Sequence, residues 1–389
     1  MRLLALARTL PFHSAGGMQS VAWDLLRAFA QRGHDVTVLT TALPDHRRSF
    51  EAEGVSIVPI DRTTPERCDR TWWSGSRAYA GSSLGRQPDA VLSISAAGAG
   101  LLPLRERWKR TPFVFQAHGT SWGEVVSKWQ SGRTLQRAKA ARNLYWLFKD
   151  AFIYRKFDRI VAVGDVVQQQ LRHWPHTRLT PGLDVDVIRN GIDTQLFKPD
   201  AAARAEVRRQ QGWGAEDRVA VFAARLHPQK GGAQAIRAFE RLPASPRTTR
   251  LLIVGSGAEE IALRQQAQQS SAAARVHFTG SVDREKMPAL LAAGDAFVFP
   301  SLRQEGLPMN VLEALACGLP PLCASHMRPV FDSTLPISFA DPNDADAMAT
   351  ALGAALHQGA SDRSLLSSSY TLKECASRYL SLFERLRAA

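Results

Sequence analysis

Short apolar runs alternate with helix-like stretches along the whole chain, and this alternation limits the possible folds more than any other feature of the sequence. A first series of runs lies at residues 2–7, 35–40, 55–60, 90–95, 112–116, 159–163 and 185–188, and a second at 219–223, 251–254, 276–279, 296–299 and 319–323. Strands that alternate with helices form a parallel sheet covered on both faces. The sequence therefore predicts an α/β protein with two doubly wound sheets.

The two series meet near Asp200, where the pattern of apolar runs resets. A length of 389 residues fits two domains. We expect an N-terminal Rossmann-like domain over 1–200, a second one over 201–370, and an amphipathic C-terminal helix over 371–389. Open parallel sheets bind their ligands outside the carboxyl ends of the strands, so site residues are expected directly after the apolar runs.

The composition excludes several classes of protein. Hydrophobic residues make up 45% and charged residues 22%, as in soluble globular proteins. The longest apolar run, around 91–104, is shorter than the ~20 residues that cross a bilayer. The four cysteines have no paired spacing, which indicates neither a disulfide framework nor a zinc site. Because Arg8 interrupts the first apolar run, we expect no signal peptide and a cytoplasmic protein.

The strongest motif is SLRQEGLPMNVLEALACGLP at residues 301–320, directly after an apolar run. Proline near its start and glycine just past its end predict a helix over 308–317, with Glu305 in the loop before it. Glu313 inside the helix can accept hydrogen bonds from vicinal hydroxyls such as those of a ribose, and Glu305 from the hydroxyls of a sugar. Alternatively, both are ordinary surface carboxylates.

The backbone at the start of this helix forms a second part of the same motif. The N–H groups of Gly306, Leu307 and Met309 have no intrahelical acceptor and lie at the positive end of the helix dipole. Such a helix start is a ready site for a phosphate. The segment can therefore bind a hydroxyl, a diphosphate and a second hydroxyl in succession.

A second motif, VFAARLHPQKGG at 221–232, places Arg225 and Lys230 in the loop after an apolar run. Both cations are expected at the carboxyl edge of the second sheet. A guanidinium and an ammonium group there suit a diphosphate leaving group, whose negative charge grows as its bond to carbon breaks. Taken alone, each is as easily a solvated surface cation.

Weaker signals lie in three other loops that follow apolar runs. Gly16 and Gly17 occupy the first strand-to-helix loop, where glycine lets the backbone approach a ligand, although a plain tight turn is the alternative. His118 follows the run at 112–116 and is either structural or part of a site. The turns at 255–257 and 280–282, which include Gly255 and Val282, are candidates to hold a nucleobase.

In chain order, AGGMQ, FQAHGT, VIRNGIDTQLF, ARLHPQKG, IVGSG, FTGSV and EGLPMNVLEALACGLP resemble the retaining glycosyltransferases of family 4. The resemblance implies the GT-B fold, in which two Rossmann-like domains face a central cleft and the C-terminal helix crosses back to the N-terminal domain. It also implies transfer of a sugar from a nucleotide-diphosphate donor to a hydroxyl, with retention at the anomeric carbon. Neither a cofactor nor an essential metal is expected.

The resemblance further implies a role for each motif residue. Arg225 and Lys230 would bind the donor diphosphate, Glu313 the ribose and Glu305 the donor sugar, while His118 would lie near the reacting sugar. The remaining donor-binding positions would be Gly16, Gly17, Gly255, Val282, Gly306, Leu307 and Pro308. Asp184 and Asp186 superficially match a metal-binding D-x-D pattern, but they precede the VIRNGID segment, and no metal site is predicted.

Positive charge is concentrated in the first half of the chain. The net charge is +13, and residues 1–200 hold 28 Lys and Arg against 18 Asp and Glu. Residues 127–160 combine nine of these cations with seven aromatic residues. This segment is either an interfacial helix that contacts anionic lipid or an ordinary helix with a core stripe of Leu144, Leu147, Phe148 and Ala151.

The function predicted from these features is transfer of a sugar, with a UDP-sugar favoured over a GDP-sugar as donor, to a lipid-linked or lipopolysaccharide-type glycan at the cytoplasmic membrane face. Two alternatives remain. One is a GT-B-fold nucleotide-sugar epimerase. The other is a basic nucleic-acid-binding protein, which would leave the motifs unexplained, so no nucleic acid partner is expected.

Overall fold

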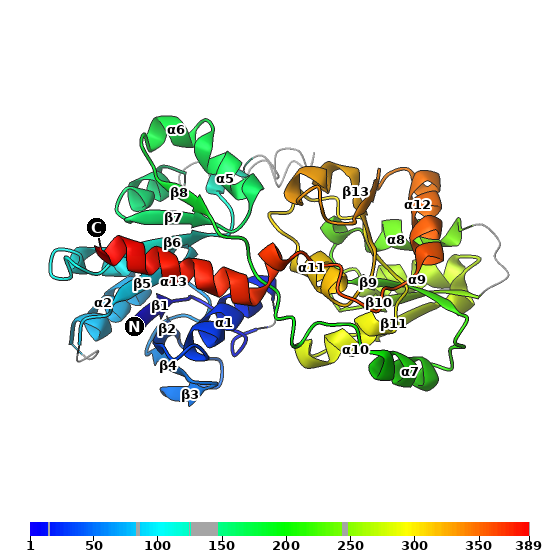
Figure 1. The fold of residues 1–389 in the computed structure, drawn as a ribbon, viewed down its shortest axis with the longest axis horizontal. Coiled ribbons are helices and arrows are strands. Elements are labelled where there is room, and N and C mark those ends of the chain that lie inside the picture. Colours follow the sequence, from blue (N-terminus) through cyan, green and yellow to red (C-terminus); the bar gives the residue numbers. More distant parts are fainter. Residues whose placement is uncertain (15, 83–85, 124, 126–146, 243–247, 389) are drawn as a thin grey trace. The chain divides into compact units, whose positions relative to one another are not determined.

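The computed structural model describes residues 1–14, 16–82, 86–123, 125, 147–242 and 248–388. Contacts divide the chain into two compact units (Figure 1). The first comprises Met1–Gly191 together with Leu372–Ala389, and the second Ile192–Thr371. The chain therefore passes from one unit to the other at residues 191–192 rather than near Asp200. Its last helix belongs to the first unit.

The sheet of the first unit has eight strands in the order β3-β4-β2-β1-β5-β6-β7-β8. Every pair is parallel except β3 with β4, a short antiparallel edge that the apolar pattern did not predict. The strands are β1 (Arg2–Leu6), β2 (Asp35–Thr41), β3 (Phe50–Ala52), β4 (Val55–Ile60), β5 (Ala90–Ile94), β6 (Phe113–Ala117), β7 (Arg159–Ala162) and β8 (Val185–Val187).

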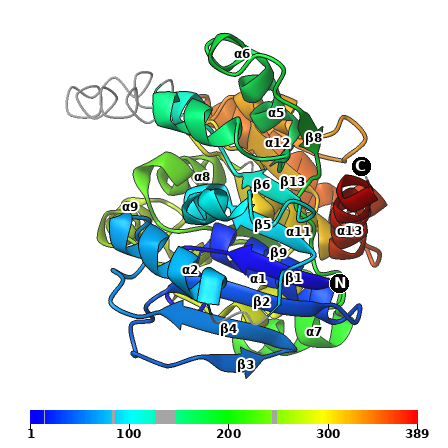
Figure 2. The same cartoon turned by 90° about the vertical axis from the view of Figure 1, so that its left-hand side faces the viewer.

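Helices cover both faces of this sheet, as Figure 2 shows for α13 on one side and α2 on the other. Side chains alternate along β1, so that Leu3 and Ala5 join one buried cluster and Leu4 and Leu6 the other. The helical elements are α1 (Gly17–Ala30), α2 (Arg70–Ser82), η1 (Ser95–Leu104), residues 147–154, α5 (Asp165–Arg172), α6 (His176–Leu179) and α13 (Leu372–Ala388).

The terminal helix α13 packs on α1 in the first cluster. The rings of Tyr379 and Phe383 meet that of Phe29 edge-on, with centroids 6.3 and 6.1 Å away. These three aromatic side chains are all essentially buried. Their packing attaches the end of the chain to the domain in which it begins, as the predicted fold requires.

The second unit contains a six-stranded, wholly parallel sheet in the order β11-β10-β9-β12-β13-β14. Its strands are β9 (Arg218–Ala223), β10 (Thr249–Val254), β11 (Val276–Gly280), β12 (Ala296–Phe299), β13 (Pro321–Ala324) and β14 (Ser338–Ala340). Its helices are α7 (Ala201–Gln210), η2 (Pro228–Lys230), α8 (Gly232–Glu240), α9 (Glu260–Gln269), η3 (Ala273–Arg275), η4 (Arg284–Lys286), α10 (Met287–Ala292), α11 (Met309–Ala316), η5 (Ser325–Val330), α12 (Ala345–Gln358) and η6 (Ser368–Tyr370).

A buried carboxylate connects the start of this sheet to α7. Asp295 accepts from Arg204 and Arg208, each at 2.6 Å, from Arg218 at 3.3 Å, and from the backbone N–H of Val219 at 2.8 Å. Only 1% of its surface is exposed. Three guanidinium groups supply the hydrogen bonds that a buried charge requires.

The basic, aromatic segment predicted at 127–160 is described only in part, since residues 126–146, and Leu144 with them, lie outside the described residues. In the helix at 147–154, Leu147 and Ala151 are buried as predicted. The prediction was wrong for Phe148, which is 60% exposed. Phe148 follows Leu147 by about 100° around the helix and therefore lies off the buried face, as does Phe152 at 63%.

Candidate functional site

The predicted donor-binding residues of the second unit lie at the carboxyl edge of its sheet. Strands β9 and β12 are parallel neighbours, so the loops that follow them leave the sheet at the same edge. The first loop carries Arg225 and Lys230, and the second carries Glu305 and leads into α11. The strand order thus brings two motifs that are far apart in the sequence to one place.

These two loops are interlocked through their backbones. The N–H of Leu302 donates to the carbonyl of Gln229 at 2.9 Å, and the Ser301 hydroxyl donates to the same carbonyl at 3.0 Å. Gly231 has φ +81°, and a Cβ atom there would lie 2.0 Å from the Pro300 carbonyl oxygen. Glycine is therefore required at this position by the close approach of the second loop.

Lys230 and Glu305 meet directly as a result. The Lys230 Nζ atom lies 2.7 Å from Glu305 Oε1, and the Ser301 hydroxyl oxygen lies 2.9 Å from the same carboxylate oxygen. Both charged side chains are largely buried, and Lys230 Nζ lies 5.6 Å from the centroid of the Phe299 ring. An ammonium group held at this point, beside an oriented carboxylate, can bind a phosphate and a sugar hydroxyl next to each other.

The helix predicted over 308–317 is confirmed as α11, Met309–Ala316. Pro308 is its N-cap and provides no side-chain acceptor, and among the first N–H groups of the helix that of Val311 donates to Asn310 Oδ1 at 3.1 Å. The Asn310 side chain donates to the carbonyl of Ala223 at 2.8 Å, which ties the start of α11 to the end of β9. Gly306 and Leu307, just before the helix, are partly exposed. This helix start therefore lies beside the loop that carries Arg225.

Glu313 has a neighbour, Arg284, that the sequence motifs did not predict. The Arg284 guanidinium lies 3.9 Å from Glu313 Oε1 and 5.4 Å over the ring of Phe197. Arg284 follows Val282 by two residues in the loop after β11, so its place in a strand-following loop was a signal that could have identified it. It restrains the carboxylate to which the ribose was assigned.

Arg225 is exposed and has no hydrogen-bond or ion-pair partner within the described ranges. Its loop packs tightly on the turn that contains Gly255. A Cβ at Gly255, where φ is +129°, would lie 2.1 Å from the Ala224 carbonyl oxygen, and Leu226 N donates to Ser256 O at 2.9 Å. The packing of the two loops therefore accounts for this glycine without a ligand.

His118 lies in the first unit, directly after β6. Its Nε2 atom is 2.9 Å from Gln116 Oε1, and the Gln116 amide N–H donates to the Tyr379 hydroxyl at 2.9 Å. Burial, with a smaller contribution from the cation of Arg8, lowers the pKa of His118 to about 4. The imidazole is therefore neutral near pH 7 and suited to hydrogen bonding.

Gly16 and Gly17 begin α1 in the same unit. Gly16 is an N-cap without a side-chain acceptor, and the first turn of the helix contains no acidic residue. A Cβ on Gly17 would meet nothing within 4 Å. The start of α1 thus combines open space with the positive end of a helix dipole, which favours an anion.

Both carboxylates of the D-x-D pattern, Asp184 and Asp186, form ion pairs with Arg159. Asp184 Oδ2 lies 3.3 Å from an Arg159 NH group, and Asp186 Oδ2 lies 3.8 Å from Arg159 Nε. Within the described part of the chain, no group of three His, Cys, Asp or Glu side chains is arranged to hold a metal ion. Nor does any helix in that part have the length and apolar character needed to cross a membrane.

Two family models match the chain in succession. The one described as Glycosyltransferase Family 4 matches residues 15–196, and the one described as Glycosyl transferases group 1 matches residues 203–369. Together they match the chain except for residues 1–14, 197–202 and 370–389.

Two curated relatives illustrate the range of similar proteins. A GDP-mannose-dependent alpha-(1-6)-phosphatidylinositol monomannoside mannosyltransferase of Mycolicibacterium smegmatis is 36% identical over 183 residues, which are 44% of this chain and 47% of the relative. A glycogen synthase of Mycobacterium tuberculosis is 28% identical over 341 residues, or 82% and 77% of the two chains. The chain thus spans about half the length of the first of these relatives.

Solved structures resemble the whole chain. Sucrose-phosphate synthase from Thermosynechococcus elongatus superimposes with a TM-score of 0.78 at 19% identity and covers 100% of both chains. Anabaena Alr3699/HepE in complex with UDP and glucose gives 0.71 at 17% identity and covers 99% of this chain and 100% of that one. At such identities the likeness concerns the fold.

Proposed function

Since this chain belongs to glycosyltransferase family 4 and has the GT-B fold of two Rossmann-like sheets that its motifs predicted, we propose that it is a retaining, metal-independent hexosyltransferase. It moves a sugar from a nucleotide-diphosphate sugar to a hydroxyl group of a glycan and keeps the configuration at the anomeric carbon. The observation that carries this proposal is the contact between Lys230 and Glu305, 2.7 Å apart beside the start of α11.

The cationic side of the site acts on the leaving group. As the bond between the anomeric carbon and the diphosphate breaks, negative charge grows on the phosphate oxygens. Lys230, Arg225 and the backbone N–H groups from Gly306 to the start of α11 stabilise that charge, which contributes most in a largely buried site. The departing phosphate then accepts the proton of the incoming hydroxyl on the same face, so no protein base is needed.

The remaining residues position the donor. Glu305 accepts hydrogen bonds from the transferred sugar and Glu313 from the ribose, while Gly255 and Val282 lie along the nucleobase. We assign the remaining contacts of Leu307 and Pro308 to sugar and phosphate. We also assign Gly16 and Gly17 to the phosphate and His118 to the reacting sugar. Catalysis by such a site consists mainly of orientation and charge stabilisation.

A UDP-sugar is the donor we favour over a GDP-sugar. The Anabaena structure of the same fold contains UDP and glucose, which supports a uridine nucleotide. The mycobacterial mannosyltransferase is by name GDP-mannose-dependent, which makes GDP-mannose the comparison of choice in any assay.

The acceptor we propose is a lipid-linked or lipopolysaccharide-type glycan at the cytoplasmic face of the membrane. Phe148 and Phe152 are exposed one turn apart on the helix at 147–154. Lys156 Nζ lies 4.1 Å over the Phe152 ring, and Arg155 is exposed beside it. Exposed aromatic side chains next to cations are typical of a helix that lies on anionic lipid. The positive charge of this region thus serves a membrane surface rather than a nucleic acid.

A thermal-shift panel tests the donor assignment. UDP, GDP, ADP, TDP and their common sugar conjugates are added to the wild type, to Lys230→Ala, and to Lys198→Ala, which removes an exposed lysine of the same unit. A ligand at 100 times its dissociation constant stabilises the fold by ~2.7 kcal/mol. We expect one nucleotide class to raise the melting temperature of the wild type and of Lys198→Ala, but not that of Lys230→Ala.

Transfer is then measured with the nucleotide sugar that binds. Release of free epimerised sugar, without transfer to any glycan, would replace the transferase by the epimerase alternative. A response to DNA or RNA with none to any nucleotide would favour the nucleic-acid-binding alternative.

A further inference from the structure

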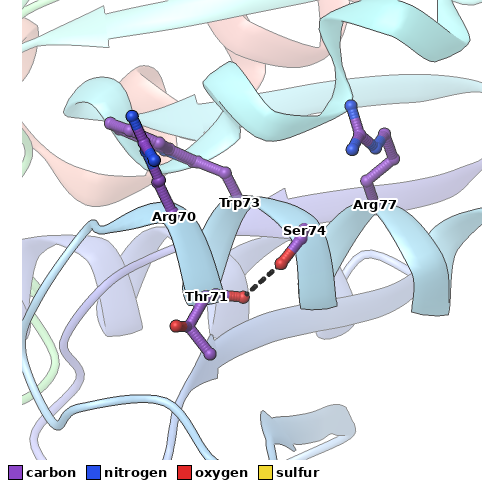
Figure 3. A pocket seen from close by; sticks show the side chains of 5 residues that line it. All are labelled: Arg70, Thr71, Trp73, Ser74 and Arg77. Atoms are coloured by element: carbon purple, nitrogen blue, oxygen red, sulfur yellow. Dashed lines mark hydrogen bonds between the residues drawn. The ribbon is translucent and has the colours of Figure 1, made fainter.

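A pocket of about 430 Å³ lies on the first unit, and none of its lining residues has been assigned a role above. It is lined by Arg70, Thr71, Trp73, Ser74 and Arg77, all in the first turns of α2. Figure 3 shows that Arg70, Trp73 and Arg77 project from the same side of the helix, whereas Thr71 points the other way. Their spacing of three and four residues produces this shared face.

The two arginines of the pocket are available to a ligand. Arg70 and Arg77 are both exposed, and neither has an ion-pair or hydrogen-bond partner among the residues that the structure describes. A guanidinium group binds phosphate through a planar fork of N–H donors, and two such groups flanking one cavity favour a multiply charged anion. The charge of the pocket therefore selects for phosphate.

Trp73 gives the same pocket an apolar wall. Its side chain is held in place by Lys149, whose Nζ lies 4.2 Å from the centroid of one of its rings. Its indole N–H is buried without a described hydrogen-bond partner. An indole ring provides a large, rigid apolar surface against which the apolar face of a sugar ring can pack. The combination suits a sugar that carries a phosphate.

The pocket lies near the carboxyl edge of the first sheet. Asp69 accepts from Trp72 N at 3.0 Å at the start of α2, and Trp72 Nε1 donates to the carbonyl of Ala97 at 2.9 Å. These bonds tie the first turn of α2, which follows β4, to η1, which follows β5. His118 follows β6 at the same edge of the sheet.

Electrostatic interactions link the pocket to His118. Burial raises the pKa of the Cys68 thiol to about 11, while the cations of Arg8 and Lys149 act in the opposite direction. Arg8 also acts on His118. Arg8 therefore interacts with both Cys68 and His118, and Lys149, which contacts Trp73, interacts with Cys68.

We infer that the face formed by Arg70, Trp73 and Arg77 binds a phosphorylated sugar of the acceptor glycan. The two guanidinium groups bind the phosphate, and the indole packs on the sugar ring. The identification of this sugar as part of the acceptor rests on the proposed transferase function. The binding of a sugar phosphate to this face does not depend on that function.

Isothermal titration calorimetry without nucleotide tests the inference. The probes are glucose 6-phosphate, glucuronate, glucose and inorganic phosphate. We expect glucose 6-phosphate to bind more tightly than the other three. Arg70→Gln/Arg77→Gln should weaken its binding at least about tenfold, and Trp73→Leu should reduce its advantage over inorganic phosphate.

Two controls separate this pocket from general electrostatics and from the donor site. Lys109→Gln/Arg110→Gln removes two exposed cations from the same unit and should leave binding unchanged, with all variants checked for an unaltered melting temperature. Lys230→Ala alters the second unit and should also leave binding unchanged. If Lys230→Ala abolishes binding, the sugar phosphate occupies the donor site and the inference fails.

Three further results would overturn the inference. The first is an equal loss of affinity for glucose 6-phosphate in Arg70→Gln/Arg77→Gln and in Lys109→Gln/Arg110→Gln. The second is binding of inorganic phosphate as tight as that of glucose 6-phosphate, and the third is binding of glucuronate that is tighter than that of glucose 6-phosphate. Conversely, loss of glucose 6-phosphate binding in Arg70→Gln/Arg77→Gln alone would support the inference even if no sugar transfer were ever detected. Failure of the sugar-phosphate site and failure of the transferase function can therefore be told apart.

Discussion

Gln116 donates a hydrogen bond to the hydroxyl of Tyr379, 263 residues further along the chain, at 2.9 Å. Both side chains are completely buried. The other end of the Gln116 amide contacts His118, so the last helix of the chain helps to orient the histidine assigned to the reacting sugar. Through this bond the terminal helix has a role beyond covering the sheet.

Tyr379→Phe removes the acceptor and leaves a buried amide N–H unsatisfied. We expect the variant to lose about 1–3 kcal/mol of unfolding free energy, measured by urea denaturation. Tyr79→Phe, at a half-exposed position of the same unit, serves as the control and should change stability little. An unchanged midpoint for Tyr379→Phe would show that this bond contributes nothing to stability.

Arg225→Ala separates binding of the diphosphate from stability of the fold. Because Arg225 is exposed and has no partner in the described ranges, its removal should change the free energy of unfolding by no more than about 0.5 kcal/mol. Turnover should fall about 10²-fold or more, as for loss of a group that stabilises charge in the transition state. Initial rates at saturating donor provide the measurement, and wild-type turnover would remove Arg225 from the site.

Glu305→Gln and Glu305→Ala test the sugar-binding carboxylate. Both should lower turnover by orders of magnitude. Both variants remove the carboxylate that pairs with the largely buried Lys230, but glutamine keeps an amide oxygen that can accept from the ammonium group and alanine keeps none, so we expect the alanine variant to be the less stable of the two. Melting temperatures check the order of stability, and initial rates check the loss of turnover. An active alanine variant would contradict the assignment of Glu305 to the sugar.

Asp295→Asn should be the most destabilising of these changes. The substitution neutralises a buried carboxylate and leaves Arg204, Arg208 and Arg218 around a neutral side chain. Breaking a buried ion pair in this way costs roughly 3–5 kcal/mol. Asp362→Asn, at an exposed position of the same unit, is the matched control for guanidinium denaturation. Equal midpoints for the two variants would show that the network is dispensable.

Stability should fall as the pH is lowered through the titration range of two histidines. Burial lowers the pKa of both His118 and His176 to about 4, against about 6.5 in the unfolded chain. The unfolded state therefore binds more protons between these values, so the stabilisation is complete above pH 6.5 and lost as the pH falls towards 4. Each histidine contributes on the order of 3 kcal/mol.

Unfolding curves recorded between pH 4 and 7 measure this dependence. His176→Gln should flatten it, because the variant has no imidazole to protonate in the unfolded state. A slope that the variant leaves unchanged would assign the pH dependence to other groups.

The sequence was sufficient to predict elements whose signal is local. The segment at 301–320 contains a loop and a helix start, and α11 confirms it because proline and glycine mark the two ends of a helix through their own backbone preferences. The loops with Arg225, Lys230 and Glu305 were predictable for the same reason, since each directly follows an apolar run. Phe148 was misassigned because the apolar character of a side chain does not by itself indicate which helix face is buried.

The order of apolar runs and helix-like stretches was enough to predict the succession of strands and helices, and with it the chemical groups that follow each strand. Which of these groups meet depends on how the elements pack. The contact of Arg284 with Glu313 and the bond from Gln116 to Tyr379 depend on strand order and on helix packing. Hydrophobic periodicity indicates which face of a helix or strand is buried. Contacts between distant residues arise only when the elements pack together, and such contacts leave no local pattern in the sequence.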